Sequence, residues 1–248
     1  MARQKGLMKF SGTLDGINFY IVKGVGYARK AGGGFNGNAI RYQPNMQRVR
    51  ENASEFGRCS KVKKEFKLSL HPFLAGYKDP KLHARMMSLF MSIKALDEVS
   101  TRGNRRVSRG LQSAKGRKLL GDFDFTPQHK MLEALVRKSA FNWSLQRLSI
   151  SDFDSRLYKH PKSATHIGIT LGILDFNFDS LISSVRVAPT YFLEVGIGSF
   201  SFEITMEQVI IPEYVGIAVL GLRFYEVIDG EVYGLNGMVG VKLLEVRV

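Results

Sequence analysis

Apolar residues near the start of the chain are spread along a glycine-rich track in the manner of short β-strands. Asp15-Gly16 and Lys23-Gly24 are natural turn positions, so residues 7–31 are predicted to form a β-hairpin or a small meander. Residues 31–37 hold four glycines and predict a flexible or tightly turning loop. The apolar positions are Leu7, Phe10, Leu14, Ile17, Phe19, Ile21 and Val25.

The pattern then changes to apolar residues at three- and four-residue steps, the period of an amphipathic helix. A long helix is predicted to begin near Pro44, because proline suits the first turn. Its apolar stripe is Met46, Val49, Ala53, Phe56, Cys59, Val62, Phe66 and Leu70. A second helix is predicted to begin at Asp79-Pro80, with the apolar side Leu82, Met86, Leu89, Phe90, Ile93 and Leu96. A third is predicted over residues 105–120, with Val107, Leu111 and Leu119 inward.

From Phe123 onward, alternation and β-branched residues predict a series of strands. Turn signals at Asp229-Gly230 and Asn236-Gly237 favour an antiparallel β-sandwich or a partly open barrel. The expected strands are 123–125, 141–145, 167–171, 185–187, 192–197, 200–204, 215–225 and 239–246. The predicted fold class is α+β, with a basic hairpin and helical domain at residues 1–122 and a β-rich domain at residues 123–248.

Charge is unevenly distributed over the 248 residues, whose formal net charge is +14. Residues 1–150 hold 29 Lys and Arg against 10 Asp and Glu, whereas residues 151–248 hold 7 against 12. This asymmetry indicates a polyanionic partner for the basic part, either nucleic acid or an acidic surface. The acidic half of another copy of the chain is an alternative partner of the same kind.

The basic residues expected to meet such a partner lie at the end of the hairpin, on the long helix and in the turn near residue 105. Phosphate contacts there would be independent of base sequence and strongly salt-dependent. Aromatic residues among them (Tyr20, Tyr27, Phe35, Tyr42) add the expectation of stacking on unpaired bases. Against this, solvated helix faces are usually charged, and aromatic residues near a hairpin usually belong to the core. The candidate polyanion-binding residues are Arg29, Lys30, Arg48, Arg50, Arg58, Lys61, Lys63, Lys64, Lys67, Arg102, Arg105, Arg106 and Arg109.

Residue types that carry catalysis or hold metals do not occur at suitable spacings. No histidine lies three to five residues from another histidine or from Cys59, so no metal motif results. Cys59 is the only cysteine and falls on the predicted apolar stripe, where a small buried side chain is expected. No Gly-x-Ser-x-Gly occurs, and glycines 32–37 fit no phosphate-loop pattern. We therefore predict no enzyme, no catalytic residue, no cofactor and no metal.

Two pairs of carboxylates are the main exception to this absence. Asp122 with Asp124, and Asp152 with Asp154, would each share one face of a strand. Both pairs lie beside turns, where aspartate commonly caps the chain. An enzymatic or sugar-binding hypothesis requires Asp152, Asp154 and His166 to converge in one pocket, whereas His166 at a strand start is otherwise expected to be structural.

The compartment is predicted from what the sequence lacks. No run of about 18 apolar residues occurs, so no membrane span is expected. The first residues lead into no apolar stretch of signal-peptide length, and a lone cysteine suits a reducing compartment. The protein is predicted to be cytoplasmic, or part of a particle assembled in the cytoplasm.

Short motifs, most of them in the front half, carry a family resemblance. They are Met1-Ala2-Arg3-Gln4-Lys5-Gly6, Gly12-Thr13, Phe19-Tyr20, Tyr27-Ala28-Arg29, Gly32-Gly33, the run Arg50-Glu51-Asn52-Ala53-Ser54-Glu55-Phe56-Gly57-Arg58, Arg102-Gly103, Ala164-Thr165-His166 and Phe224-Tyr225. In these motifs the chain resembles an uncharacterised protein family found in Bacteroidota. The resemblance implies no activity, so it transfers no catalytic residue and no ligand.

These patterns favour a non-enzymatic structural subunit that assembles with itself into a particle, tube or filament. The β-domain would supply the protein contacts, while the basic half would meet a polyanion or the acidic face of a neighbour. The alternative is a nucleic-acid-binding protein that acts as a small oligomer and contacts DNA or RNA independently of sequence.

Overall fold

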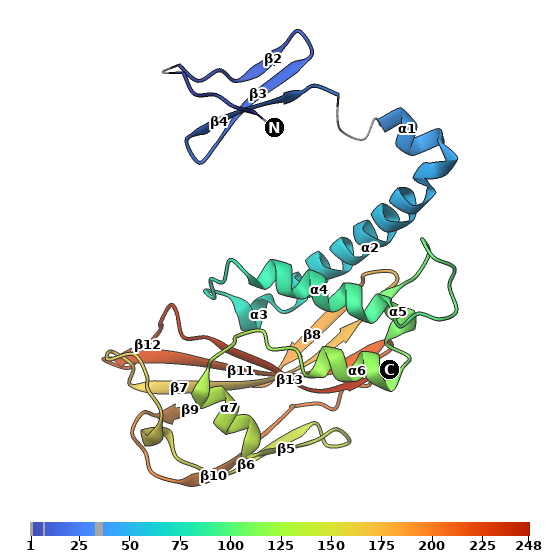
Figure 1. Ribbon diagram of the computed structural model, residues 1–248. Coiled ribbons are helices and arrows are strands. Elements are labelled where there is room, and N and C mark those ends of the chain that lie inside the picture. The colour runs from blue at the N-terminus through green and yellow to red at the C-terminus, as the bar shows by residue number, and fades with distance from the viewer. Residues whose placement is uncertain (1, 7, 33–36) are drawn as a thin grey trace. The chain divides into compact units, whose positions relative to one another are not determined.

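The computed structural model describes residues 2–6, 8–32 and 37–248 and contains 30% helix and 33% strand (Figure 1). N-terminal strands, a helical middle and a curled C-terminal antiparallel sheet that forms a half-barrel confirm the predicted α+β class. Of the two architectures expected for the C-terminal part, the partly open barrel is therefore the one observed. The chain divides into two compact units, residues 1–53 and 54–248, which are described separately.

The first unit contains a four-stranded antiparallel sheet in the order β1-β4-β3-β2. Its strands are β1 (Ala2–Arg3), β2 (Gly12–Leu14), β3 (Ile17–Val22) and β4 (Val25–Lys30). The predicted turns are confirmed: Asp15, Gly16, Lys23 and Gly24 all have positive φ, as two-residue hairpin turns require. Leu7 and residues 33–36 of the predicted loop lie outside the described residues. Helix α1 (Gly37–Tyr42) and the 3-10 helix η1 (Pro44–Met46) follow.

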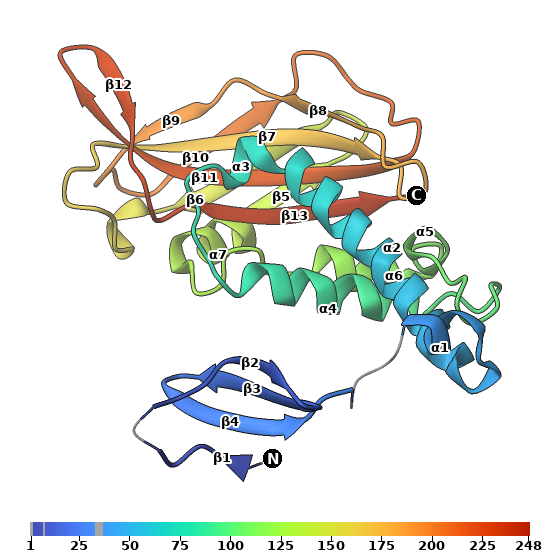
Figure 2. The same ribbon diagram turned by 90° about the horizontal axis from the view of Figure 1, so that it is seen from above.

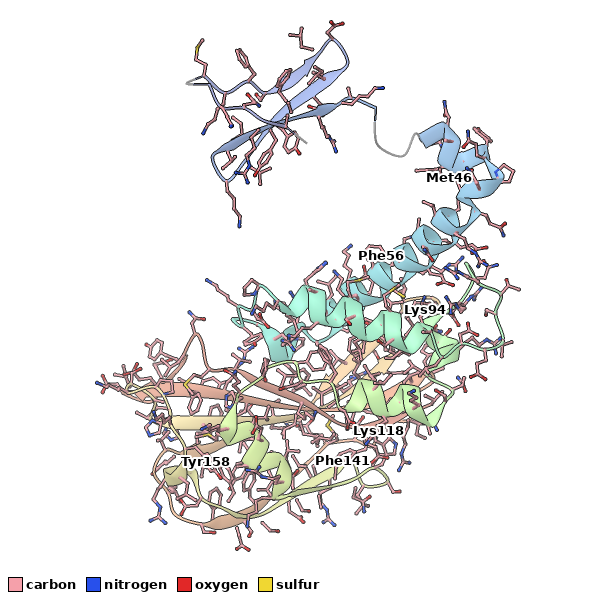
Figure 3. The ribbon with its side chains drawn as sticks, in the orientation of Figure 1. Met46, Phe56, Lys94, Lys118, Phe141 and Tyr158 are labelled. Atoms are coloured by element: carbon pink, nitrogen blue, oxygen red, sulfur yellow. The ribbon has the colours of Figure 1, made fainter. Side chains whose placement is uncertain are left out.

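The long predicted helix is α2 (Gln47–Ser69), followed by α3 (His71–Leu74) and α4 (Leu82–Lys94). The second predicted helix is present but begins at Leu82, three residues after Asp79, and its N-cap is Lys81. The Asp79 carboxylate instead orders the preceding turn, where it accepts a hydrogen bond from the backbone N–H of Lys81 at 2.7 Å. Two positions of the predicted stripe on α2 are wrong: Ala53 and Phe56 are exposed, Phe56 by 53% (Figure 3), whereas Glu55 between them is buried. The reason is that this part of α2 meets polar groups of α4 and of the loop after it.

The segment predicted as one helix over 105–120 is broken into α5 (Val107–Gly110) and α6 (Ala114–Gly121). Ser113 starts the second helix, because its hydroxyl accepts a hydrogen bond from the backbone N–H of Gly116 at 3.0 Å. The predicted strand at 123–125 is also wrong, since these residues form an irregular connection. It leads to a helix that was not predicted, α7 (Lys130–Arg137), which His129 caps.

Two antiparallel sheets make up the rest of the second unit. The smaller contains β5 (Ser139–Asn142), β6 (Arg147–Phe153) and β10 (Phe200–Thr205) in the order β10-β6-β5, and η2 (Ser155–Leu157) follows β6. The larger contains β7 (His166–Phe176), β8 (Ser183–Val187), β9 (Tyr191–Glu194), β11 (Val215–Ile228), β12 (Glu231–Gly234) and β13 (Gly240–Arg247). The long pair β7 and β11 is at its centre, with Phe176 opposite Val215 and His166 opposite Tyr225.

The larger sheet lies between α2 and α4 on one face and the smaller sheet with α7 on the other (Figures 1 and 2). Successive residues of β11 therefore enter different cores: Val219 joins the helices, whereas Leu220 joins the smaller sheet. This explains why β11 is apolar almost throughout. Phe73 of α3 lies against Gly172 and Gly221, where an added Cβ would come within 2.5 and 2.7 Å of its ring.

The helices between residues 54 and 122 share their core with the sheet. The ring centroids of Phe66 on α2 and Phe90 on α4 are 5.6 Å apart, and those of Phe66 and Phe176 on β7 are 5.3 Å apart. Neither layer could bury its apolar side without the other. The division of the chain into compact units at residues 53 and 54 therefore does not coincide with the predicted boundary at residues 122 and 123.

Candidate polyanion-binding site

Four of the thirteen candidate residues lie in the first unit. The Arg29 guanidinium lies over the Tyr20 ring, 5.6 Å from its centroid, and Lys30 is exposed at the end of β4. Arg48 pairs with Glu51 at 3.2 Å on an exposed helix face. Arg50 donates to the backbone carbonyls of Ile40 and Gln43, and these bonds hold the turn that leads into α2.

The lysines of α2 divide into two kinds. Lys61, Lys64 and Lys67 are exposed, and Lys64 makes only a loose pair with Glu65 at 3.4 Å. Lys63 is buried, with its Nζ 2.8 Å from Nδ1 of His83 on α4. Burial lowers the pKa of the Lys63 ammonium, and the neighbouring charge of Lys67 lowers it further. Lys63 therefore faces the interior, unlike the other three lysines.

A buried carboxylate, Glu55 of α2, receives hydrogen bonds from α4 and from the loop after α4. It accepts hydrogen bonds from Lys94 Nζ at 2.5 Å, from Arg105 Nε and Nη2 at 2.8 and 3.0 Å, and from the backbone N–H of Gly103 at 2.8 Å. Burial alone would raise the pKa of this carboxyl, but the four hydrogen bonds and the charge of Lys94 outweigh it. The pKa of Glu55 is lowered from 4.5 to about 2.

A second buried carboxylate, Asp97, orders the loop that carries the arginines. It accepts hydrogen bonds from the backbone N–H groups of Val99, Ser100 and Arg106 at 3.1, 2.9 and 2.8 Å. Burial raises the pKa of Asp97, yet these hydrogen bonds bring it below its ordinary value. The loop from 97 to 106 is therefore fixed by two anions that are themselves removed from solvent.

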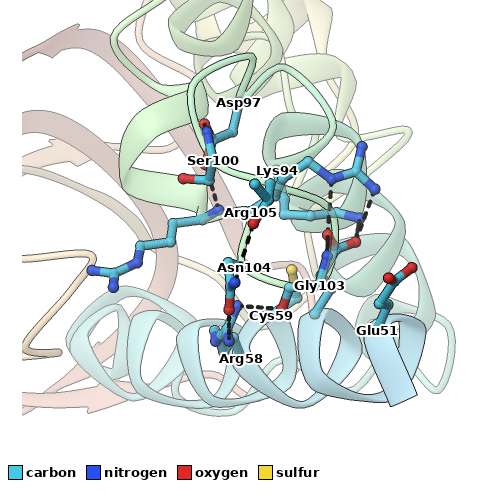
Figure 4. Close-up of polar contacts among 12 residues, drawn as sticks. Glu51, Arg58, Cys59, Lys94, Asp97, Ser100, Gly103, Asn104 and Arg105 are labelled. Carbon is cyan, nitrogen blue, oxygen red and sulfur yellow. Dashed lines mark hydrogen bonds and ion pairs between the residues drawn. The ribbon is translucent and has the colours of Figure 1, made fainter. Parts of the chain in front are cut away.

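Arg58, three residues after Glu55 on α2, forms a second connection between this helix and the same loop (Figure 4). Its Nη1 donates to the carbonyl of Gly103 at 2.9 Å, and its Nη2 donates to Oδ1 of Asn104 at 3.1 Å. Arg102 and Arg109 are exposed, and Arg106 pairs loosely with Asp179 at 3.4 Å. Arg105 is the loop arginine that faces Glu55.

A cavity of about 360 Å³ lies between α2 and this loop, and four candidate residues line it: Arg58, Lys61, Arg105 and Arg106. Its floor is apolar and includes Val62, Val107 and Phe178, while Asp179 is the acidic residue in its wall. The structure thus brings four of the thirteen residues together. The remaining nine do not line this cavity.

The residues that position this cluster were not predicted from the sequence. Glu55, Lys94 and Asp97 were not among the candidates, although Glu55 lies four residues before Cys59, which is the spacing of a shared helix face. An acidic residue on the inward side of a basic helix is the signal that could have identified it. Asp97 gives no comparable signal, because its partners are backbone N–H groups.

The groups proposed for an enzymatic site keep separate partners. Asp154 pairs with Arg156 at 2.7 Å and caps η2, whereas the backbone N–H of Asp152 donates to the hydroxyl of Ser201 at 3.1 Å. The Nδ1 atom of His166 lies 2.9 Å from the hydroxyl of its neighbour Thr165. None of the hydrogen bonds and ion pairs found in the described residues links these three side chains.

A larger cavity, of about 620 Å³, lies beside His129 and includes Tyr77, Tyr158 and Lys159 in its wall. His129 caps α7: its Nδ1 accepts from the backbone N–H of Leu132 at 3.2 Å, and its Nε2 lies 3.3 Å from the carbonyl of Met238. Burial lowers the pKa of His129, and its hydrogen bond to Met238 acts in the opposite direction. These contacts give His129 a structural role.

Within the described residues, no three His, Cys, Asp or Glu side chains are close enough together to hold a metal ion. In the same part of the chain, no helix has the length and apolar character needed to cross a bilayer. No protein-family model, curated protein or solved structure matches this chain.

Proposed function

We propose that this protein is a non-enzymatic structural subunit that assembles with itself, and that the sheet β1–β4 of one copy packs on a second copy. The observation that carries the proposal is that this sheet has no core. Among the described residues before Glu55, only Gly26 is buried. Four strands that bury no side chain are not stable by themselves, since a sheet needs a covered apolar face.

One face of the sheet is apolar and open. Leu14 lies opposite Ile17 in the register, and Ile21 follows on the same face of β3. These three side chains are 72%, 43% and 47% exposed. Phe10 is 61% exposed, and its ring centroid lies 6.3 Å from that of Phe19. Full burial of such a side chain contributes about 1.5–3 kcal/mol, so covering the exposed parts of these four would contribute about 3–7 kcal/mol.

The opposite net charges of the N-terminal and C-terminal segments support a second copy of the chain as the partner. Residues 1–53 carry 9 Lys and Arg against 2 Asp and Glu, whereas residues 151–248 carry 7 against 12. The hairpin of β11 and β12 is the acidic and apolar surface that suits this sheet best. It carries Glu226, Asp229 and Glu231, with no Lys or Arg from 224 to 241, and its Val232 and Tyr233 are 50% and 54% exposed.

Size-exclusion chromatography with light scattering over a range of protein concentrations tests this proposal. The variant Ile17→Asp/Ile21→Asp places two charges on the apolar face and is expected to reduce the assembly to monomers. The matched control Asn18→Asp/Val22→Asp adds the same two charges at the same spacing on the opposite face of β3 and is expected to assemble. A wild-type protein that is monomeric at every concentration would contradict the proposal, as would equal behaviour of the two variants.

A further inference from the structure

We propose that the cavity between α2 and the loop from 97 to 106 binds phosphates of a nucleic-acid backbone, with Lys61 and Arg106 as the contacting residues. This inference is independent of self-assembly. Lys61 is exposed on the wall formed by α2. The Arg106 side chain is 58% exposed on the wall formed by the loop, and its 3.4 Å pair with Asp179 is one that a phosphate can replace.

The site is ordered before a ligand arrives. Glu55 holds Arg105 and the backbone of Gly103, Asp97 holds the backbone of Arg106, and Arg58 connects α2 to Gly103. The Arg58 and Arg105 side chains and the backbone that carries Arg106 are thus fixed by contacts inside the protein. A rigid arrangement loses less conformational entropy when it binds, which raises affinity.

The charge around the cavity is positive after its internal pairs are counted. Five cations (Arg58, Lys61, Lys94, Arg105, Arg106) lie against three anions (Glu55, Asp97, Asp179), which leaves an excess of two positive charges. Two of the anions are buried behind the loop together with Lys94, so Lys61 and Arg106 are the cations of this group that are exposed to solvent. The apolar floor strengthens any ion pair formed above it, because it lowers the local dielectric constant.

An extended polyanion suits this surface better than a single small anion. Lys64 and Lys67 are exposed three and six residues after Lys61 on α2, about 4.5 and 9 Å farther along the helix axis. Because the helix turns about 100° per residue, Lys64 lies about 60° around the axis from Lys61, so these two side chains are near enough to contact neighbouring phosphates of one strand. Arginine guanidinium groups also match the geometry of phosphate oxygens.

The test is fluorescence anisotropy with labelled (dT)20 and U20 oligonucleotides from 50 to 200 mM salt. Lys61→Gln/Arg106→Gln removes two exposed charges and is expected to weaken binding at least tenfold. It should also reduce the slope of log K against log salt by about 1.5, since each lost phosphate contact accounts for about 0.7–0.9. The control Arg137→Gln/Lys138→Gln removes one arginine and one lysine from the exposed end of α7 and is expected to bind as the wild type does.

Absence of binding by the wild type would overturn the inference, and so would an unchanged salt slope in the Lys61/Arg106 variant. A competition experiment distinguishes a nucleic-acid ligand from an acidic protein. If a 20-residue poly-glutamate displaces labelled (dT)20 at equal charge concentration, the cavity is a binding surface for acidic proteins, and the nucleic-acid assignment is overturned. Displacement by the oligonucleotide but not by poly-glutamate would support it. The assembly size, measured in parallel, is expected to be the same for both variants.

Discussion

Replacing Glu55 by glutamine tests whether this carboxylate organises α2, α4 and the loop after α4. The substitution keeps the size of the side chain and removes its charge. Lys94, whose side chain is 5% exposed, would then be buried without a counter-ion, and the new amide group would face cations. The three groups that donate to Glu55 would share one neutral amide oxygen in place of two charged carboxylate oxygens.

Two independent arguments give the magnitude. Breaking a buried ion pair by removing one partner destabilises proteins by about 3–5 kcal/mol. The pKa of Glu55 is lowered from 4.5 to about 2, and each unit corresponds to about 1.36 kcal/mol, which gives about 3 kcal/mol. For a domain of this size, the loss of about 3 kcal/mol lowers Tm by about 6–12 °C.

The pH dependence has a definite sign. Because the folded-state pKa lies below the ordinary value, the contribution of Glu55 to stability is present above pH 4.5 and is lost as the pH falls towards about 2. Urea unfolding of the wild type and of Glu55→Gln at pH 7, 4.5, 3 and 2 measures this. The difference in unfolding free energy between the two proteins should shrink steadily below pH 4.5.

Glu65→Gln is the matched control, because Glu65 lies on the same helix and makes only a loose pair with the exposed Lys64. Its expected effect is below about 1 kcal/mol at every pH. A Glu55→Gln protein that loses less than about 1 kcal/mol at pH 7 would refute the reasoning. So would a difference between wild type and variant that does not change with pH.

Two further predictions concern the core. Gly172→Ala would place a Cβ 2.5 Å from the ring of Phe73 and 3.0 Å from the carbonyl oxygen of Arg186, so we expect the free energy of unfolding, measured by thermal denaturation, to fall by about 1–3 kcal/mol. Partial recovery of stability in Gly172→Ala/Phe73→Leu would show that the ring is responsible, whereas an unchanged stability of Gly172→Ala would contradict the prediction. Burial raises the pKa of the Cys59 thiol to about 11, so the native protein should resist Ellman's reagent at pH 8, whereas the urea-unfolded protein should react fully. Rapid reaction of the native protein would show that Cys59 is not buried.

The sequence by itself determined the elements whose signals are local. The turns at Asp15-Gly16 and Lys23-Gly24, the α2 helix and the turn at Asp79 before α4 depend on backbone preferences and on a regular apolar period, which are properties of neighbouring residues. The α+β class followed from the same signals. Short elements such as α7 were not found, because eight residues carry too little periodicity to stand out from a strand-rich context.

Tertiary structure decided which charged residues face solvent and which are buried. Lys61 and Lys63 are both lysines on the basic face expected for α2, yet Lys61 is exposed whereas Lys63 lies against His83 of α4. Glu55 was not predicted as part of the site, because its partners come from residues 94, 103 and 105. A helix period gives the direction of a side chain around its own axis, but burial and ion pairing depend on segments far away in the sequence. That is why the charge asymmetry was visible in the sequence, while the cavity that gathers four of those charges appeared only in the folded chain.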